Sequence, residues 1–329
     1  MKPKISVIIP VYNDPEGLRV TLESLVAQDF PRTEFEIIVV DNGSTDHTRE
    51  IAATYAAAYP DLVIAVEENE IQSSYAARNK EIRVSRGQVL CFVDANMSVE
   101  QDYLAKVDRL FASGCVDYVG FSVKMVFKIR SIAALYDCMT GFNIQHDIEH
   151  VGFAPTCCLA IRREIVEKVG MFDSRLVSGG DLEFGRRVKE AGFSLRYVPD
   201  ICMMHPARST LGSLIAKHIR IGRGFRQLKL YYPDRFRHYG TIGWMLQHLL
   251  PSIPWRFWRE YKTSPIWTSA SPITKISLYG VRWIVKLARL YGYLIEWRGE
   301  LKRVGPSKQQ GYQGCAQRTP DVGIGSSSL

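Results

Sequence analysis

Several features that define other protein classes are missing from this sequence of 329 residues. The seven cysteines are odd in number and show no spacing typical of a disulfide framework or of a metal cluster. No signal-peptide core follows Met1, because the first apolar run spans only about five residues. No internal repeat is visible. These absences argue against a disulfide-stapled secreted domain, and they predict a cytoplasmic protein in a reducing compartment.

Acidic residues are scarce in the back of the chain. Residues 206–305 hold 18 Lys plus Arg but only 4 Asp plus Glu, whereas the remainder holds 24 basic and 30 acidic residues. A basic segment of this kind suits an anionic lipid surface, nucleic acid or an acidic partner, and charge alone does not choose between them. Nucleic-acid binding lacks a recognisable motif here, so we do not expect a nucleic-acid partner.

Tryptophan is absent before residue 244, and all six tryptophans fall in the basic segment. They are Trp244, Trp255, Trp258, Trp267, Trp283 and Trp297. Indole rings favour the boundary between lipid headgroups and acyl chains, so the combination with basic charge predicts contact with an anionic membrane surface, from its cytoplasmic side. A second hydrophobic core that contains tryptophan is the alternative.

Short apolar runs punctuate the front of the chain, and they are typical of strands buried on both faces. They are Ile5 to Ile9, Phe35 to Val40, Leu62 to Val66 and Val89 to Val93. Helical patterns fill the gaps between them. Because strand and helix alternate, we expect an α/β fold with a doubly wound, mainly parallel sheet that binds its ligands at the carboxyl ends of the strands.

The length of the chain favours one sizeable α/β domain plus an appendage. We divide it into a catalytic domain over residues 1–210 and a basic, helical region over 211–304. Residues 305–329 are rich in Gly, Gln and Ser and lack apolar periodicity, which predicts a disordered tail.

One amphipathic helix is expected within the basic region. Its cations fall on a single helical stripe, which consists of Lys275, Arg282, Lys286 and Arg289. Apolar residues cover the rest of the surface, a pattern with a wide apolar face. The charges near its middle argue against a transmembrane span. A helix lying in the membrane interface and a helix packed against the catalytic domain both remain open.

Polar residues follow the first two predicted strands. Asp14 and Pro15, after the first strand, have the residue types of a helix cap and a first helical position. Asp41 ends the second strand, where a carboxylate can accept a hydrogen bond from a base N–H or a ribose hydroxyl. Asp46 has the simpler interpretation of a helix cap.

The fourth strand closes with Asp94 and Asn96. Residues i and i+2 face the same way in extended chain, so both side chains can offer oxygen ligands to one Mg²⁺ or Mn²⁺ that bridges a diphosphate. An ordinary polar turn is the alternative. Arg78, in a predicted helix, can grip a diphosphate through its planar guanidinium, or it is simply an exposed helical arginine.

The order of these motifs is recognisable. VIIPVYN at 7–13, VDNGSTD at 40–46, ARN at 77–79 and FVDAN at 92–96 resemble the nucleotide-binding half of family 2 glycosyltransferases, which have the GT-A fold. SGGDLEF at 178–184 is similar to that family's acidic acceptor-site motif. The resemblance covers about residues 5 to 210.

The resemblance implies roles for individual residues. Pro10, Tyr12 and Asp41 would contact the nucleotide, Arg78 the nucleotide or its phosphates, and Asp94 the ribose or the metal. Asp181 matches the family's general base, which takes the proton of the acceptor hydroxyl. A helix cap is the alternative for Asp181.

Three further positions bear on the metal and the acceptor. The family usually has Asp at the position of Asn96 and Glu at the position of Gly180, and both departures weaken the transfer of roles. A neutral amide binds a hard cation less strongly than a carboxylate does. His205 lies where related enzymes often place a metal- or phosphate-contacting histidine, and a structural histidine is an equal alternative.

The basic region opens with Arg220, Arg223 and Arg226, spaced three apart on a predicted helix. They can reach phosphates of a donor, a lipid carrier or a membrane, or form a solvated face. We therefore expect an inverting glycosyltransferase of hexosyltransferase type, with a nucleotide-sugar donor, a glycan or lipid-linked acceptor, and Mg²⁺ or Mn²⁺ as cofactor. A noncatalytic nucleotide-sugar-binding scaffold of the same fold is the alternative.

Overall fold

A computed structural model describes residues 2–303 of the chain. Within them one mixed sheet has the strand order β3-β2-β1-β4-β7-β6-β8-β5. The strands are β1 (Ile5–Val11), β2 (Phe35–Asp41), β3 (Val63–Glu67), β4 (Val89–Val93), β5 (Ser98–Val99), β6 (Tyr118–Val126), β7 (Cys158–Arg162) and β8 (Leu195–Pro206). The predicted tail over 305–329 lies outside the described residues.

The half of the sheet that β1 to β4 form is parallel; β1, β2 and β4 are deeply buried, whereas β3 at the edge is partly exposed. Every residue of β2 and β4 is buried, as the continuous apolar runs predict. β7 then runs antiparallel to β4 and β6, while β6 and β8 pair in parallel with a register shift between Phe121 and Ser122. The sheet is therefore mixed but mainly parallel, as expected.

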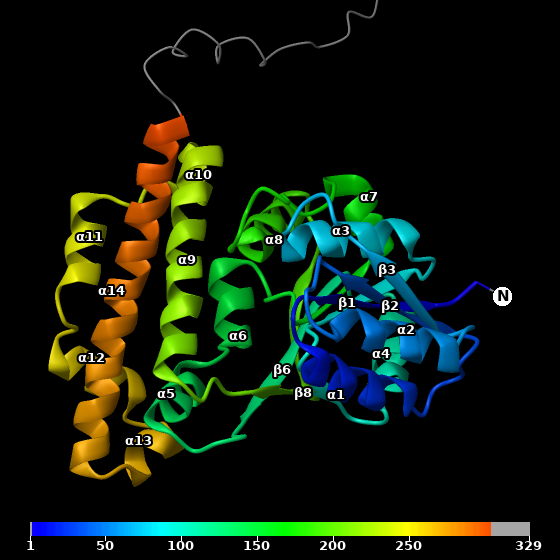
Figure 1. The fold of residues 1–329 in the computed structure, drawn as a ribbon, viewed down its shortest axis with the longest axis horizontal. Coiled ribbons are helices and arrows are strands. Elements are labelled where there is room, and N and C mark those ends of the chain that lie inside the picture. Colours follow the sequence, from blue (N-terminus) through cyan, green and yellow to red (C-terminus); the bar gives the residue numbers. More distant parts are fainter. Residues whose placement is uncertain (1, 304–329) are drawn as a thin grey trace, which may run out of the picture.

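Helices connect these strands and cover both faces of the sheet (Figure 1). They are α1 (Pro15–Val26), α2 (Thr48–Ala58), α3 (Ser74–Val84), α4 (Tyr103–Ala112), α7 (Arg163–Val169) and α8 (Gly180–Glu190). The start of α1 follows the predicted capping: the Asp14 side chain accepts a hydrogen bond from the Gly17 N–H at 2.9 Å, and Pro15 takes the first helical position. Figure 1 shows α1 and α2 on one face of the sheet and α3 and α8 on the other.

The register of the parallel strands determines where the functional residues meet. Val11 at the end of β1 pairs with Asp41 at the end of β2. On its other side β1 pairs in parallel with β4, where Ile8 is opposite Phe92. Since three parallel strands end at the same edge, the residues that follow them gather there.

The remaining helices form the second part of the molecule. They are α5 (Ile132–Thr140), α6 (Ile144–His146), a π-helical turn (Asp147–Val151), α9 (Leu211–Tyr231), α10 (Pro233–Phe236), α11 (Ile242–Leu249), α12 (Pro254–Tyr261), α13 (Pro265–Ser269) and α14 (Pro272–Arg303). None of the helices among residues 2–303 combines the length and the apolar character that crossing a bilayer requires.

The long helices α9 and α14 lie side by side (Figure 1). Two glycines permit the close approach, because a side chain at Gly222 would overlap the backbone of Arg289, and one at Gly292 would overlap the backbone of Ile219. Arg223 and Glu296 form an ion pair across this contact at 2.7 Å. Helix α14 is thus packed along one side, mainly against α9 and α11, and it also contacts α5 from the part of the chain before residue 211.

The predicted basic stripe of α14 is only partly exposed. Lys286 is 9% exposed, and Arg289 donates from Nε to Nδ1 of His218 on α9 at 2.9 Å. The region also includes α5, which the boundary at residue 210 had placed elsewhere. Its residues Ala133 and Tyr136 share a small core with residues of α9 and α14.

Gly292→Ala is expected to destabilise the fold by about 1–3 kcal/mol, because the added methyl group would collide with the carbonyl group of Ile219 in a packed contact. Gly280→Ala on the same helix is the matched control. Nothing lies within 4 Å of a Cβ there, so alanine should stabilise the protein by about 0.5–1 kcal/mol through helix propensity. Urea unfolding of both variants measures the difference, and equal shifts would contradict the close approach.

Candidate active site

A cleft of about 660 Å³ opens at the carboxyl ends of β1, β2 and β4. Most of the predicted donor-site residues line it, together with residues from α3, β8 and α9. Those singled out from the sequence are Pro10, Tyr12, Arg78, Asp94, Asn96, His205, Arg220 and Arg223. The sheet topology therefore brings side chains from five parts of the chain to one hollow.

The centre of this cleft is an ion pair between α3 and β4. Arg78 Nη2 donates to Asp94 Oδ1 at 2.7 Å, and Arg78 is only 4% exposed. Its guanidinium also lies over the Tyr75 ring, 5.8 Å from the centroid. Arg78 is thus a buried, oriented cation rather than an exposed helical arginine. A planar guanidinium held in this way suits a diphosphate ligand.

Three side chains in the cleft could hold a divalent cation. The Oδ1 atom of Asn96 is buried without a hydrogen-bond partner, and Asp94 uses only Oδ1 for Arg78. His205 donates from Nδ1 to the Pro206 carbonyl at 2.8 Å, which leaves Nε2 as its ligating atom. Burial lowers the pKa of His205, which favours the neutral, ligating form.

This donor set fits a Mg²⁺ or Mn²⁺ ion that also binds a diphosphate, since such ions usually take few protein ligands and complete their shell with phosphate and water. Among residues 2–303 no group of three or more His, Cys, Asp or Glu side chains is placed to hold a metal. Within the set Asp94, Asn96 and His205, the carboxylate of Asp94 is the only charged oxygen donor.

Asp41 takes a different position from the other predicted residues. It is buried at the end of β2 and does not line the cleft. One carboxylate oxygen accepts a hydrogen bond from the Ser44 N–H at 3.0 Å, and the other has no partner. The next residue, Asn42, does line the cleft, and its side chain donates to the carbonyls of Glu68 and Ile71.

Asp181 is half-buried in the first turn of α8, on the same face of the sheet as α3. Its Oδ1 atom accepts a hydrogen bond from the Leu182 N–H at 3.0 Å. Burial raises the pKa of Asp181, while that N–H and the charges of Arg78 and Arg220 act in the opposite direction. Both arginines line the cleft, so the carboxylate lies beside it without being part of its wall.

A steric contact explains why a glycine, Gly180, precedes Asp181. A Cβ at Gly180 would approach the Tyr75 ring to 2.7 Å, and the Gly180 N–H donates to the Tyr75 hydroxyl at 2.9 Å. Tyr75 from α3 thus occupies the space that a side chain at position 180 would need. This contact fixes the start of α8, and with it Asp181, against the cleft.

Three residues near the site, Arg208, Asp147 and Tyr75, were not predicted from the sequence. Arg208 lines the cleft and pairs with the buried Asp137 at 3.5 Å. Asp147, in the π-helical turn, has its pKa raised to about 6 by burial and by the negative charge of Asp181. No motif marks these positions, and Tyr75 reads as an ordinary helical residue, so only the tertiary structure reveals them.

The three arginines of α9 separate in space. Arg220 and Arg223 line the cleft, where Arg220 donates to the Val177 carbonyl at 3.2 Å. Arg226 does not line it and instead pairs with Glu300 of α14. The regular spacing of the three arginines therefore does not give them one role: two face the cleft, and the third pairs with α14.

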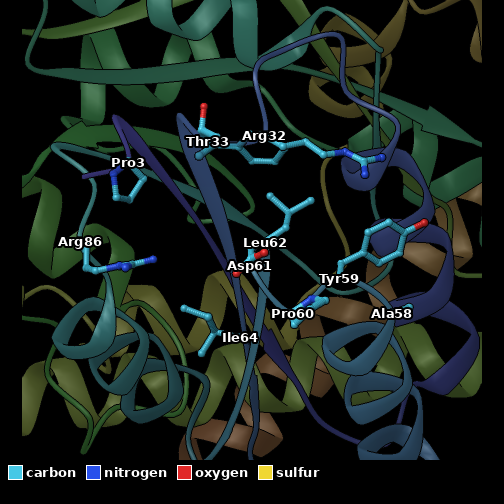
Figure 2. A pocket seen from close by; sticks show the side chains of 11 residues that line it. Pro3, Arg32, Thr33, Ala58, Tyr59, Pro60, Asp61, Leu62, Ile64 and Arg86 are labelled. Carbon is cyan, nitrogen blue, oxygen red and sulfur yellow. The ribbon is translucent and has the colours of Figure 1, made fainter. Parts of the chain in front are cut away.

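A second hollow, of about 640 Å³, lies at the opposite ends of the strands (Figure 2). Figure 2 shows Arg32, Asp61 and Arg86 among its lining residues. Its cations are already engaged, because Arg86 pairs with the buried Glu36 at 2.9 Å and Arg32 lies over the Tyr59 ring. Doubly wound sheets bind ligands at the carboxyl ends of their strands, so we place the active site in the other cleft.

The fold is that of a GT-A domain. The Glycosyl transferase family 2 model matches residues 6–170, and the Glycosyl transferase family group 2 model matches residues 89–295. The chain is 35% identical over 299 residues to Glycosyltransferase AglE of Haloferax volcanii, an alignment that covers 89% of this chain and 95% of that protein. The chain therefore belongs to glycosyl transferase family 2.

Solved structures agree on the fold. A mannosyltransferase from Pyrobaculum calidifontis, PcManGT, in complex with GDP-Man and Mn²⁺, superposes with a TM-score of 0.61 at 19% identity, over 91% of this chain and 88% of that one. S. aureus TarS 1–349 in complex with UDP-GlcNAc gives 0.53 at 19% identity, over 90% and 92%. The predicted GT-A fold and the predicted glycosyltransferase activity are thus confirmed.

Asn96→Asp is expected to strengthen Mn²⁺ binding in the presence of a nucleoside diphosphate by roughly tenfold, because a second carboxylate replaces a neutral amide in the donor set. Asn13→Asp makes the same chemical change in the neighbouring loop, outside the cleft lining, and should leave the affinity unchanged. Calorimetric titration with Mn²⁺ measures both variants. Equal affinities for Asn96→Asp and the parent protein would remove Asn96 from the metal site.

Proposed function

We propose that this protein is an inverting glycosyltransferase that holds a nucleotide-diphosphate-sugar in the cleft beside Asp94 and activates an acceptor hydroxyl with Asp181. The observation that carries the proposal is the convergence of Arg78, Asp94 and Arg220 in one cleft, with Asp181 beside them. Two structural neighbours were solved with GDP-Man and with UDP-GlcNAc, which supports a donor of this chemical class.

The donor's diphosphate is the ligand that the charges of the cleft suit. Arg78, Arg208, Arg220 and Arg223 line it from α3, the loop after β8, and α9. Preorganised cations of this kind stabilise the negative charge that develops on a departing diphosphate, and this is usually the largest contribution to catalysis. A divalent metal held by Asp94, Asn96 and His205 would neutralise further charge on the same phosphates. Pro10 and Tyr12 lie where the nucleotide would extend from the end of β1.

The base acts on the other side of the donor sugar. Asp181 accepts the proton of an acceptor hydroxyl while that oxygen bonds to the anomeric carbon and the bond to the diphosphate breaks, which inverts the anomeric configuration. Burial raises the pKa of Asp181, so it accepts this proton more readily than an exposed carboxylate would. Asp147 lies near enough for its own pKa to respond to Asp181.

The acceptor in this proposal is a glycan or a lipid-linked sugar, as in the synthesis of polysaccharides and glycoconjugates. Curated relatives include a poly(ribitol-phosphate) beta-glucosyltransferase of Bacillus spizizenii, which is 34% identical over 103 residues that cover 31% of this chain and 16% of that protein.

A noncatalytic scaffold of the same fold was the alternative. That alternative rests on Asn96 and Gly180, the two departures from the family's pattern, and the Tyr75 ring gives a steric reason for the glycine.

Asp181→Asn is expected to reduce sugar transfer by about 10²–10⁴-fold while donor binding is retained, because the amide cannot take the acceptor proton. Nucleotide-sugar turnover over a panel of acceptors gives the rate, and calorimetry with UDP- and GDP-sugars gives the affinity. Asp147→Asn is the matched control, which should lower the rate far less. A large loss at Asp147 with a fully active Asp181→Asn variant would move the base to the π-helical turn.

We further propose that the helical part rests on the cytoplasmic face of a membrane. Large apolar side chains are exposed on α11, α12, α14 and the loop between α11 and α12. They include Ile242 at 79% exposure, Trp255 at 61% and Ile276 at 72%, as well as Leu246, Leu249, Leu250, Ile253, Trp258, Ile273 and Trp283. This number of exposed apolar side chains in a basic region supports binding to an anionic bilayer.

Replacing Trp255 and Trp258 together by serine is expected to weaken binding to anionic vesicles by roughly tenfold or more, because two indole rings would no longer enter the interface. The rings stack on one another at 4.9 Å on α12, so they act as one exposed unit. Val20→Ser on α1, an exposed apolar residue on the sheet side of the molecule, is the control. Unchanged sedimentation with vesicles for the tryptophan variant would contradict the proposed membrane face.

A further inference from the structure

A small hollow of about 80 Å³ lies between α11 and α14, away from the active-site cleft. Its walls are Gln247 and His248 at the end of α11, Ser252 in the following loop, and the α14 residues Arg282, Val285, Lys286 and Arg289. At about 30 Å³ per water molecule, this volume holds two or three waters or one small polyatomic group. The hollow is too small for a nucleotide or a sugar chain.

The charge inside the hollow is unbalanced. Three cations face it, and the carboxylate that approaches them is Glu260, whose Oε2 atom lies 3.3 Å from Arg282 Nη2 and which is about half exposed. Neither Lys286 nor Arg289 forms an ion pair with any described residue. Like charges at close range repel, so the arrangement calls for an anion that the described chain does not provide.

Several N–H groups of these cations are unused. Nε of Arg282 is buried and has no acceptor. Arg289 uses Nε for His218, and its terminal nitrogens have no acceptor among the described residues. Lys286 donates to the Leu250 carbonyl at 2.7 Å and to the Ser252 hydroxyl at 3.4 Å, which leaves one of its three protons. The unused donors thus come from all three cations of the hollow.

Burial makes the charged forms of these side chains less favourable. It lowers the pKa of Lys286 and of Arg289, and the positive charge of Arg282 lowers both further. Burial also brings the pKa of His248 down to about 4, so the histidine in the wall is neutral at physiological pH. A bound anion would relieve this desolvation, because charge-assisted hydrogen bonds are the strong ones.

Exposed apolar residues flank the hollow along the chain, and we call them its apolar rim. Leu249 at the end of α11, and Leu250 and Ile253 in the following loop, are each about half exposed and are neighbours in sequence of the wall residues His248 and Ser252. Trp283 Nε1 donates to the Leu249 carbonyl at 2.9 Å, and the Tyr279 hydroxyl donates to the Ser252 carbonyl. An anionic group in the hollow would therefore lie close to exposed apolar residues that suit acyl chains.

We propose that Arg282, Lys286 and Arg289 form a binding site for the phosphate headgroup of a lipid. The cations and their unused N–H groups match a phosphate in charge and in donor number, and the volume accommodates a single one. The apolar rim assigns the phosphate to a lipid rather than to a free ion. The site goes beyond the proposed transfer reaction, and it does not depend on the role of Asp181.

A soluble probe tests the site without any membrane. Calorimetry of the full-length protein compares dihexanoyl phosphatidic acid, below its micellar concentration, with inorganic phosphate. The lipid phosphate should bind at least about tenfold more tightly, because its acyl chains contact the rim. Equal affinities would overturn the lipid assignment, and absence of binding by both probes would overturn the site, whatever the vesicle experiments on the tryptophans show.

Variants connect the binding to these cations. Lys286→Met keeps the length of the side chain, and it should weaken binding of the lipid phosphate by about tenfold or more through the loss of one charge-assisted contact. Arg289→Gln gives an independent second measurement should one of the two fail to fold. Arg298→Gln removes one exposed charge from the same helix and is the matched control. Equal weakening by the control would show a diffuse basic surface and overturn the proposal.

A vesicle arm separates headgroup recognition from membrane contact. Vesicles of phosphatidylcholine alone report the apolar contact, and vesicles that also contain phosphatidic acid report the headgroup. Lys286→Met should lose the preference for phosphatidic acid and keep the binding to phosphatidylcholine, whereas the double tryptophan variant should lose both. A Lys286→Met protein that keeps the full preference for phosphatidic acid would overturn the proposal.

Discussion

The parallel pairing of β1 with β2 and β4 is the constraint on which the active site depends. It places the ends of three strands at one edge, so that Tyr12, Asn42 and Asp94 reach the same cleft from positions far apart in the chain. These strands are mostly apolar and deeply buried, and their burial holds the register. The position of the residues in the cleft therefore depends on the packing of the buried strands.

Ion pairs connect this edge of the sheet to the second, helical half of the protein. Arg78 is held by Asp94, Arg208 by Asp137 and Arg223 by Glu296, so the cations of the cleft are oriented before any ligand arrives. An oriented cation costs little reorganisation when a diphosphate binds. Asp137 also pairs with Lys217 on α9, which links α5 and α9 to the cleft through one buried carboxylate.

The sequence predicted the parallel strands and singled out eight residues that line the cleft, because apolar runs and the turn residues after them are local signals. It could not show that Asp41 is turned into the backbone of its own loop, since that depends on the hydrogen bond to Ser44. Tyr75 and Asp147 were missed because their importance comes from contacts with distant segments. The basic stripe of α14 was interpreted too simply, since periodicity alone does not distinguish a face that packs on another helix from one that meets solvent.

The glycine contacts between α9 and α14 have a mechanical consequence. Helices whose backbones touch cannot slide past one another without losing contact on both sides, so Gly222 and Gly292 couple the two as one rigid rod. One side of this rod carries Arg220 and Arg223 in the catalytic cleft, and the other carries the apolar loop and its cations. A tilt imposed at the outer surface would thus be transmitted over the width of the rod to Arg220 and Arg223 in the cleft.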